Sequence, residues 1–121
     1  MKAVFIETTN FTEWFGEYLS DDEYAALQQI LMENPTRGDV MPGCGGLRKV
    51  RTASAKRGKG KRSGARVIYL YVPENRWFFM LDIYGKDEKD DLAAAEKTAL
   101  SALAGHLKQQ AQLAVPKRRS R

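Results

Sequence analysis

Apolar residues along this chain recur with two different periods, one typical of strands and one typical of helices. The run "KAVFIET" at residues 2–8 is apolar and β-branched and predicts a first strand. Further along, "LRKVRTA" at 47–53, "ARVIYLYV" at 65–72 and "RWFFMLDIY" at 76–84 predict three more strands. The turn Pro73-Glu74-Asn75 separates the last two strands and is short enough for a hairpin.

Helical periodicity fills the stretch between the first two predicted strands. One apolar face at i, i+3, i+4, i+7 and i+8 is formed by Phe11, Trp14, Phe15, Tyr18 and Leu19. Asn10 and Glu13 have the spacing of a cap pair that would begin this helix. Ser20 and Glu23 form a capping-box pattern that would begin a second helix, and Asn34-Pro35 would end it.

A last amphipathic helix is expected from about Leu92 to Gln112, with an apolar stripe of Leu92, Ala99, Leu100, Leu103 and Leu107. The predicted order is therefore β-α-α-β-β-β-α. This order indicates an α+β domain in which one antiparallel-rich sheet carries helices on one face. We expect a single domain over residues 1–112 and a basic, disordered tail over 113–121.

Composition narrows the class of protein. A chain of 121 residues is typical of one domain, and 43% hydrophobic with 29% charged residues is ordinary for a soluble globular protein. No stretch approaches the ~18–20 apolar residues of a membrane span, and the N-terminus lacks a signal-peptide pattern. The single Cys44 excludes an internal disulfide and a multi-cysteine metal site. We expect a cytoplasmic protein that uses no metal and no cofactor.

Charge is strongly segregated along the chain, whose net charge is +5. No Lys or Arg occurs from Ala3 to Thr36, whereas no Asp or Glu occurs from Val40 to Pro73. The acid-free window could be a solvated basic loop. Because such segregation costs self-repulsion, it is also consistent with a polyanionic partner.

The usual catalytic constellations are missing. His106 is the lone histidine, Cys44 has no histidine or cysteine near it, and "GKGKRSG" lacks the spacing of a phosphate-binding P-loop. The pairs Asp87-Glu88 and Asp90-Asp91 could hold a metal, but acids that open a helix more simply favour its dipole.

What remains is a set of cations and a tyrosine on predicted strands. Strand alternation places Lys49 and Arg51 on one face and Arg48 with Val50 on the other. If the three strands of the acid-free half are neighbours, their cations can converge on one surface that binds a phosphodiester and stabilises a pentavalent transition state. RNA supplies its own nucleophile, the 2′-OH. Proton transfer could come from a Lys or Tyr whose pKa is lowered by neighbouring cations.

Three motifs carry a family resemblance: "GCGGLRKVR", "GKGKRSGARVIY" and "LDIYGKDEKDDL". Together with the element order they resemble the RelE-superfamily toxins, specifically the HigB-type branch of type II toxin–antitoxin systems. The resemblance implies a metal-independent, ribosome-dependent endoribonuclease that cuts mRNA on the 70S ribosome and so inhibits translation. It also implies a cognate antitoxin, of HigA-like type with a DNA-binding domain.

By this resemblance, Lys49 and Arg51 match the paired strand cations of the family, Arg66 its strand arginine, and Lys86 its terminal-strand lysine. Asp87 and Leu92 stand where RelE has an arginine and a tyrosine, so Tyr84 is our substitute candidate for proton transfer, with a buried structural tyrosine as the alternative. The expected catalytic set is thus Lys49, Arg51, Arg66, Tyr84 and Lys86. The expected RNA-binding set is Arg48, Lys56, Arg57, Lys59, Lys61, Arg62 and Arg76.

Two questions stay open at the level of sequence. A non-catalytic RNA- or ribosome-binding module of the same fold is the alternative function, although cations held rigidly on strands favour cleavage. The antitoxin could cover the Lys49–Arg66 surface, or it could dock on the helices with Trp14 or Tyr18 as an anchor.

Overall fold

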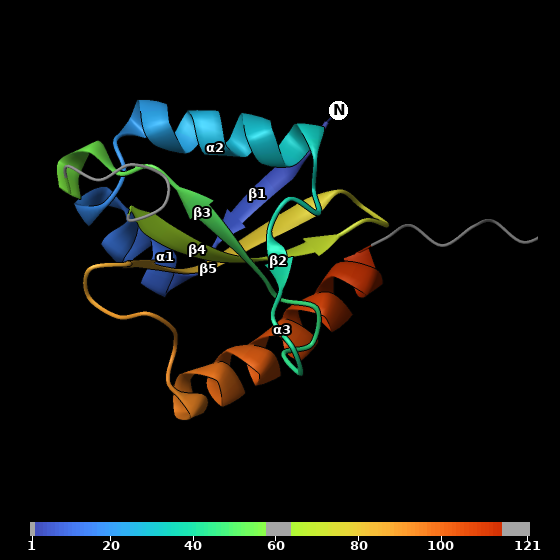
Figure 1. The fold of residues 1–121 in the computed structure, drawn as a ribbon. Helices are drawn as coiled ribbons and strands as arrows, with labels where there is room; N and C mark the ends of the chain where they lie inside the picture. The colour runs from blue at the N-terminus through green and yellow to red at the C-terminus, as the bar shows by residue number, and fades with distance from the viewer. Residues whose placement is uncertain (1, 58–63, 115–121) are drawn as a thin grey trace, which may run out of the picture.

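The computed structural model describes residues 2–57 and 64–114. In chain order the elements are β1 (Val4–Glu7), α1 (Thr9–Trp14), the 3₁₀ turn η1 (Phe15–Glu17), α2 (Asp21–Glu33), β2 (Asp39–Val40), β3 (Arg48–Thr52), the 3₁₀ turn η2 (Ala55–Arg57), β4 (Ala65–Val72), β5 (Trp77–Gly85) and α3 (Ala94–Ala114). The strands form one five-stranded sheet in the order β1-β5-β4-β3-β2 (Figure 1). Only β1 and β5 run parallel, so the prediction of an antiparallel-rich α+β fold is confirmed.

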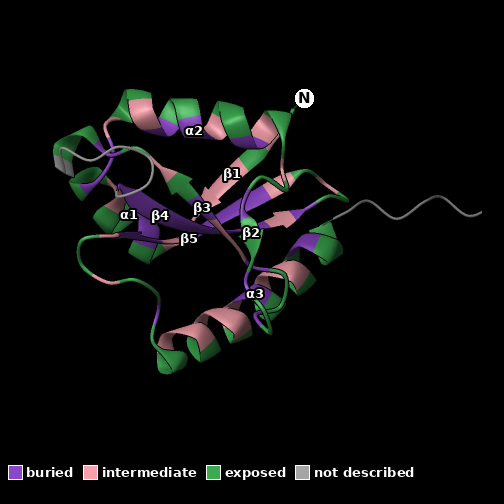
Figure 2. Cartoon of the chain, in the orientation of Figure 1, coloured by how far each residue is buried: buried purple, intermediate pink, exposed green. Residues whose placement is uncertain are grey.

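Helices cover both faces of the sheet, so the expectation that they occupy one face is wrong. In Figure 1, α2 lies above the sheet and α3 below it. The α1–α2 side contains Phe11, Leu31, Val67 and Tyr69, whereas the α3 side contains a second apolar cluster that includes Ile68, Leu70, Leu81, Ala104 and Ala111. The physical reason lies in β4 and β5, which are apolar at successive positions. Such strands are buried on both sides, as the purple core of Figure 2 shows.

The N-terminal helices begin at caps that the sequence predicted only in part. Thr8, not Asn10, caps α1: its hydroxyl accepts the Phe11 N–H at 3.2 Å and donates to the Leu81 carbonyl at 2.9 Å. Asn10 instead donates its amide to Asp82 at 2.9 Å. The capping box of Ser20 and Glu23 is confirmed in both directions, which anchors the start of α2.

The C-terminal half of the chain supplies β4 and β5, the two central strands of the sheet. β4 and β5 form the predicted hairpin, and a bulge between Ile68 and Tyr69 shifts their register. β2 was not predicted, because two residues that pair with β3 leave no periodic signal. α3 begins and ends two residues later than expected, and Leu100, Leu103 and Leu107 pack against the sheet while Ala99 is exposed.

Candidate active site

Three neighbouring strands bring two arginines and a tyrosine into one row. In the register of β3 with β4, Arg51 lies opposite Arg66, and in the register of β4 with β5, Arg66 lies opposite Tyr84. Lys49 lies two positions from Arg51 on the same strand and therefore points to the same face. We call Lys49, Arg51, Arg66 and Tyr84 the cation–tyrosine row. It lies on the α3 face, as the pairing of Lys49 with the buried Ile68 of the α3-side cluster shows.

Two guanidinium groups in direct register are unfavourable unless something offsets their repulsion. Like charges opposite one another on antiparallel strands destabilise the pair. Arg66 is only 7% exposed, and its pKa is lowered first by burial and then by the positive charge of Arg51. A polyanion placed over both arginines would relieve this repulsion and would be held by two planar, multidentate donors.

Tyr84 combines burial with an unused hydroxyl. The side chain is 3% exposed, and among the residues that the structure describes its hydroxyl oxygen is buried without a hydrogen-bond partner. Burial and, secondarily, the nearby Asp91 raise the pKa of Tyr84 to about 12, whereas Arg66 acts in the opposite direction. We expected neighbouring cations to lower the pKa of a proton-transfer group. For Tyr84 this is wrong, because desolvation outweighs the charge of Arg66. At neutral pH the Tyr84 phenol is therefore protonated.

The segment between β5 and α3, residues 87–91, folds back on the candidate lysines, and we call it the acidic turn. Asp91 accepts from Lys49 at 3.2 Å and from Lys97 at 2.7 Å, and Asp90 accepts from Lys86 at 2.8 Å. Hydrogen bonding from Lys97 is the largest of several causes that lower the pKa of Asp91 to about 2. The acids at 87–91 were expected to favour a helix dipole, but α3 begins only at Ala94, and Asp90 and Asp91 pair with lysines instead.

The predicted RNA-binding residues are dispersed. Arg48 points to the α2 face, where it donates to the Gly38 carbonyl at 2.8 Å. Lys56 donates to the Gly16 carbonyl at 2.6 Å, and Arg57 lies in η2. Lys59, Lys61 and Arg62 lie outside the described residues.

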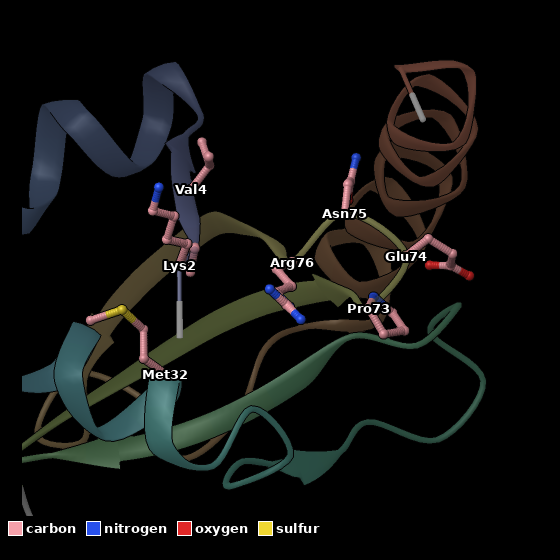
Figure 3. Close-up of a pocket in the computed structure, with 8 residues that line it drawn as sticks. Lys2, Val4, Met32, Pro73, Glu74, Asn75 and Arg76 are labelled. Carbon is pink, nitrogen blue, oxygen red and sulfur yellow. The ribbon is translucent and has the colours of Figure 1, made fainter. Parts of the chain in front are cut away.

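Arg76 sits at the opposite end of the β4–β5 hairpin from the cation–tyrosine row. It has a positive φ of 56° and lines a separate cavity of about 650 Å³ together with Lys2, Met32 and Asn75 (Figure 3). The structure therefore brings together Lys49, Arg51, Arg66 and Tyr84, with Lys86 at the adjoining strand end, but not Arg48 or Arg76.

Sequence reasoning missed a cation that lies beside Lys49 and Arg51. Arg37, in the turn after α2, lines a cavity of about 290 Å³ together with Asp39, Lys49 and Arg51. The charge pattern did not single it out, because it precedes Asp39 and so falls outside the acid-free window. The signal that would have found it is the pairing of β2 with β3, which brings the chain around Arg37 beside Lys49 and Arg51.

Within residues 2–57 and 64–114 no group of three or more His, Cys, Asp or Glu side chains could hold a metal ion. No described helix is both long and apolar enough to cross a membrane. Of the two aromatic residues considered as partner anchors, Trp14 is 49% exposed, whereas Tyr18 is buried and donates to Glu88.

Comparison with known proteins gives a family and a fold. A family model described as the RelE toxin of the RelE/RelB toxin–antitoxin system matches residues 6–118. A structure of an arginine-to-alanine double mutant of the E. coli toxin RelE in the free state is similar, with 19% identity, 85% of this chain and 97% of that chain covered, and a TM-score of 0.50. A crystal structure of the isolated E. coli RelE toxin has 15% identity, covers 84% of this chain and 99% of that chain, and gives a TM-score of 0.47. The family match spans most of the chain, and the first structural likeness agrees with it at the level of fold.

Proposed function

This chain belongs to the RelE toxin family, and we propose that it is a ribosome-dependent mRNA endoribonuclease that inhibits translation. Membership makes it the toxin of a toxin–antitoxin pair and implies an antitoxin partner. The observation that carries the proposed activity is the cation–tyrosine row: two arginines in direct register beside a buried, protonated phenol. We place the reaction in the cytoplasm, on the 70S ribosome.

The proposed reaction needs no protein nucleophile. The 2′-oxygen of the substrate attacks the adjacent phosphorus and releases its proton to solvent, while the bond from phosphorus to the 5′-oxygen breaks. Arg51 and Arg66 would neutralise the charge that builds on the phosphoryl oxygens in the transition state. Tyr84 would donate its proton to the departing 5′-oxygen, leaving a cyclic phosphate on one fragment and a free 5′-hydroxyl on the other. No step requires a metal ion.

Lys49 and Lys86 would bind phosphates on either side of the row. In the free protein both amines are held by the acidic turn, at 3.2 Å from Asp91 and 2.8 Å from Asp90. The acidic partners are 45% and 91% exposed, so these pairs are weak and can be exchanged for substrate phosphates.

The motif resemblance leads us to propose the HigB-type branch, with an antitoxin that carries a DNA-binding domain.

The decisive experiment is primer extension on mRNA bound to ribosomes, with the wild-type chain and with Arg51→Ala. Arg51 is exposed, so its removal should leave the fold intact. We expect cleavage to fall by ~10²–10³-fold, the usual cost of losing one transition-state contact. Lys108→Ala, which removes a charge on α3, is the control and should cleave normally. If the wild-type chain binds ribosomes but leaves the mRNA intact, the protein is a non-catalytic ribosome-binding module.

A further inference from the structure

A cavity of about 400 Å³ shares Tyr84 with the cation–tyrosine row. Its walls come from α1, β5, the acidic turn and the start of α3, and they include Trp14, Asp82 and Glu96. We call it the Trp14 pocket. Tyr84 is buried, and its hydroxyl has no hydrogen-bond partner among the described residues. The pocket therefore borders the group to which we assign proton donation.

The indole of Trp14 gives this pocket a flat apolar surface. Trp14 is 49% exposed, which is high for so large an apolar side chain. Within the described part of the chain no other ring packs on it, whereas its neighbours Phe11, Phe15 and Tyr24 pack against one another. An exposed aromatic ring of this kind is a surface on which an unstacked nucleobase packs.

Asp82 supplies a hydrogen-bond acceptor in the same pocket. The Asn10 amide and the Ile83 backbone N–H donate to it at 2.9 and 2.8 Å, and both bonds go to the same oxygen, Oδ1. Oδ2 has no partner among the described residues. Burial raises the pKa of the Asp82 carboxyl, so its charge is poorly solvated and gains more from a hydrogen-bond donor than an exposed carboxylate does.

The other charged side chains of the pocket already have partners. Glu96 pairs with Lys89 at 2.9 Å, and Glu88 accepts from Tyr18. With three carboxylates and one lysine in its walls, the pocket is acidic, unlike the row beside it. It therefore disfavours a phosphate and favours a neutral part of a ligand that carries hydrogen-bond donors.

We propose that the Trp14 pocket holds the base of the nucleotide on the 3′ side of the cut, stacked on Trp14 and donating an amino group to Asp82 Oδ2. This inference rests on the proposed function, in which Tyr84 protonates the departing 5′-oxygen, because the base on that same sugar lies nearest to Tyr84. Adenine, cytosine and guanine carry an amino group, whereas uracil presents a carbonyl that a carboxylate repels. Asp82 would thus help to set the sequence preference of cleavage.

A basic side chain of another protein is the competing occupant, because an aromatic ring beside carboxylates also binds cations. Two observations favour the base. The pocket adjoins Tyr84, where the departing nucleotide has to lie during cleavage and where a foreign side chain would displace it. The Lys89 amine also supplies a cation already, at 5.2 Å from the centre of the Tyr84 ring, so a second cation gains less than a neutral donor.

The test compares substrates that differ by one amino group. Ribosome-bound mRNAs with cytidine or uridine on the 3′ side of the cut form one pair, and those with adenosine or inosine form a second, so the ring size is matched within each pair. Asp82→Asn keeps Oδ1, which receives both structural hydrogen bonds, and changes only Oδ2 into an N–H donor. Glu13→Gln removes the same charge at an exposed position of α1 outside the pocket and is the matched control.

We expect the wild-type chain to cleave the amino-bearing member of each pair with a kcat/KM ~5- to 150-fold higher, the range for one well-placed base contact. Asp82→Asn should abolish or reverse this preference, because its amide donates to the carbonyl. Trp14→Ala should lower kcat/KM by a similar factor for all four substrates, since stacking depends little on base identity, and Trp14→Phe should restore most of it. Glu13→Gln should behave as the wild type.

A second measurement needs neither the ribosome nor cleavage. The chain has two tryptophans, so Trp77→Phe leaves Trp14 as its only indole. Cytidine 5′-monophosphate, whose phosphate would lie over the cation–tyrosine row, should quench Trp14 fluorescence at a lower concentration than uridine 5′-monophosphate. Asp82→Asn should remove this difference, and melting temperatures should show that all variants fold.

The outcomes separate this inference from the proposed function. The same base preference in the wild type and in Asp82→Asn, in cleavage and in quenching, would overturn the base site. If, in addition, Trp14→Ala weakens ribosome binding, the pocket receives a basic side chain of the ribosome instead. If the wild-type chain never cleaves mRNA but cytidine 5′-monophosphate binds with a preference that depends on Asp82, the proposed activity fails and the base site stands.

Discussion

Tyr84→Phe should raise the stability of this protein while removing most of its activity. The substitution deletes one oxygen atom, which is buried and without a hydrogen-bond partner among the described residues. A buried, unsatisfied hydroxyl costs ~1–3 kcal/mol, so its removal should leave the free energy of unfolding unchanged or raise it by up to that amount. If the phenol is the proton donor, the rate of cleavage should fall by ~10²–10⁴-fold.

Tyr69→Phe is the matched control, because the same atom is removed from a tyrosine that uses it. The Tyr69 hydroxyl accepts the Gly38 N–H at 3.0 Å and donates to the Pro35 carbonyl at 2.8 Å. Its loss leaves both backbone groups without this partner and should cost ~1–3 kcal/mol of stability. Cleavage should be unaffected, since Tyr69 packs in the cluster on the α1–α2 side, away from the cation–tyrosine row.

Urea unfolding and single-turnover cleavage on ribosomes measure the two quantities. We expect the two variants to shift the free energy of unfolding in opposite directions, or at least to differ by ~2 kcal/mol. If Tyr84→Phe destabilises as much as Tyr69→Phe, the Tyr84 hydroxyl has a structural partner. If it cleaves at the wild-type rate, Tyr84 is not the proton donor.

The pH dependence of stability gives an independent check on Tyr84. Its pKa in the folded chain is about 12, against an ordinary value of 10.0. The folded state therefore holds this proton more tightly than the unfolded state does. Stability from this group should be complete below pH 10 and should decline as the pH rises towards 12. Tyr84→Phe should remove that part of the alkaline decline.

Four further outcomes follow from the proposed site and from the charge of the chain. Expression of the wild-type chain should arrest bacterial growth, and Arg66→Ala should relieve the arrest at equal abundance of folded protein; equal toxicity would remove Arg66 from the site. Binding to ribosomes should weaken with salt at a log–log slope of about −0.7 per neutralised phosphate, and the slope should flatten on joint neutralisation of Lys56, Arg57, Lys59 and Lys61. Asp91→Asn should release Lys49 and tighten RNA binding in a filter assay, at a cost below ~1 kcal/mol for so exposed a pair. Because the pKa of Asp91 is about 2 rather than 3.8, its contribution to stability should persist above pH 4 and disappear only as the pH falls towards 2.

Local sequence patterns predicted most helices and strands, but they did not predict which faces of the sheet the helices cover. β4 is found at the predicted residues 65–72, because an unbroken apolar run followed by a turn has few other interpretations. The same unbroken run should have indicated helices on both faces, since a strand with one solvated face alternates. Thr8 caps α1 in place of the predicted Asn10, and its hydroxyl also donates a hydrogen bond to the carbonyl of Leu81, 73 positions away in the sequence.

In the candidate site, too, features set by neighbouring residues on one strand were predicted, whereas features set by strand pairing and packing were not. Alternation on one strand was enough to place Lys49 and Arg51 on a common face. The direct register of Arg51 with Arg66 depends on strand pairing, and the burial that raises the pKa of Tyr84 depends on packing. The bond from Lys49 to Asp91 joins residues 42 positions apart through a turn without periodicity, so no local pattern could predict it.

This last contact changes the meaning of the acid-free window. The window is free of acids in sequence but not in space, because the acidic turn brings Asp91 to Lys49 within the window. The same turn brings Asp90 to Lys86, just beyond the end of β5. Arg37 and Arg51, which are both exposed and line one cavity, receive no such partner among the described residues. In the free protein the lysines are therefore partly neutralised, while Arg37 and Arg51 keep their full charge. The first contact with an incoming anion should accordingly be made by these arginines, with the lysines exchanging Asp90 and Asp91 for phosphate only afterwards.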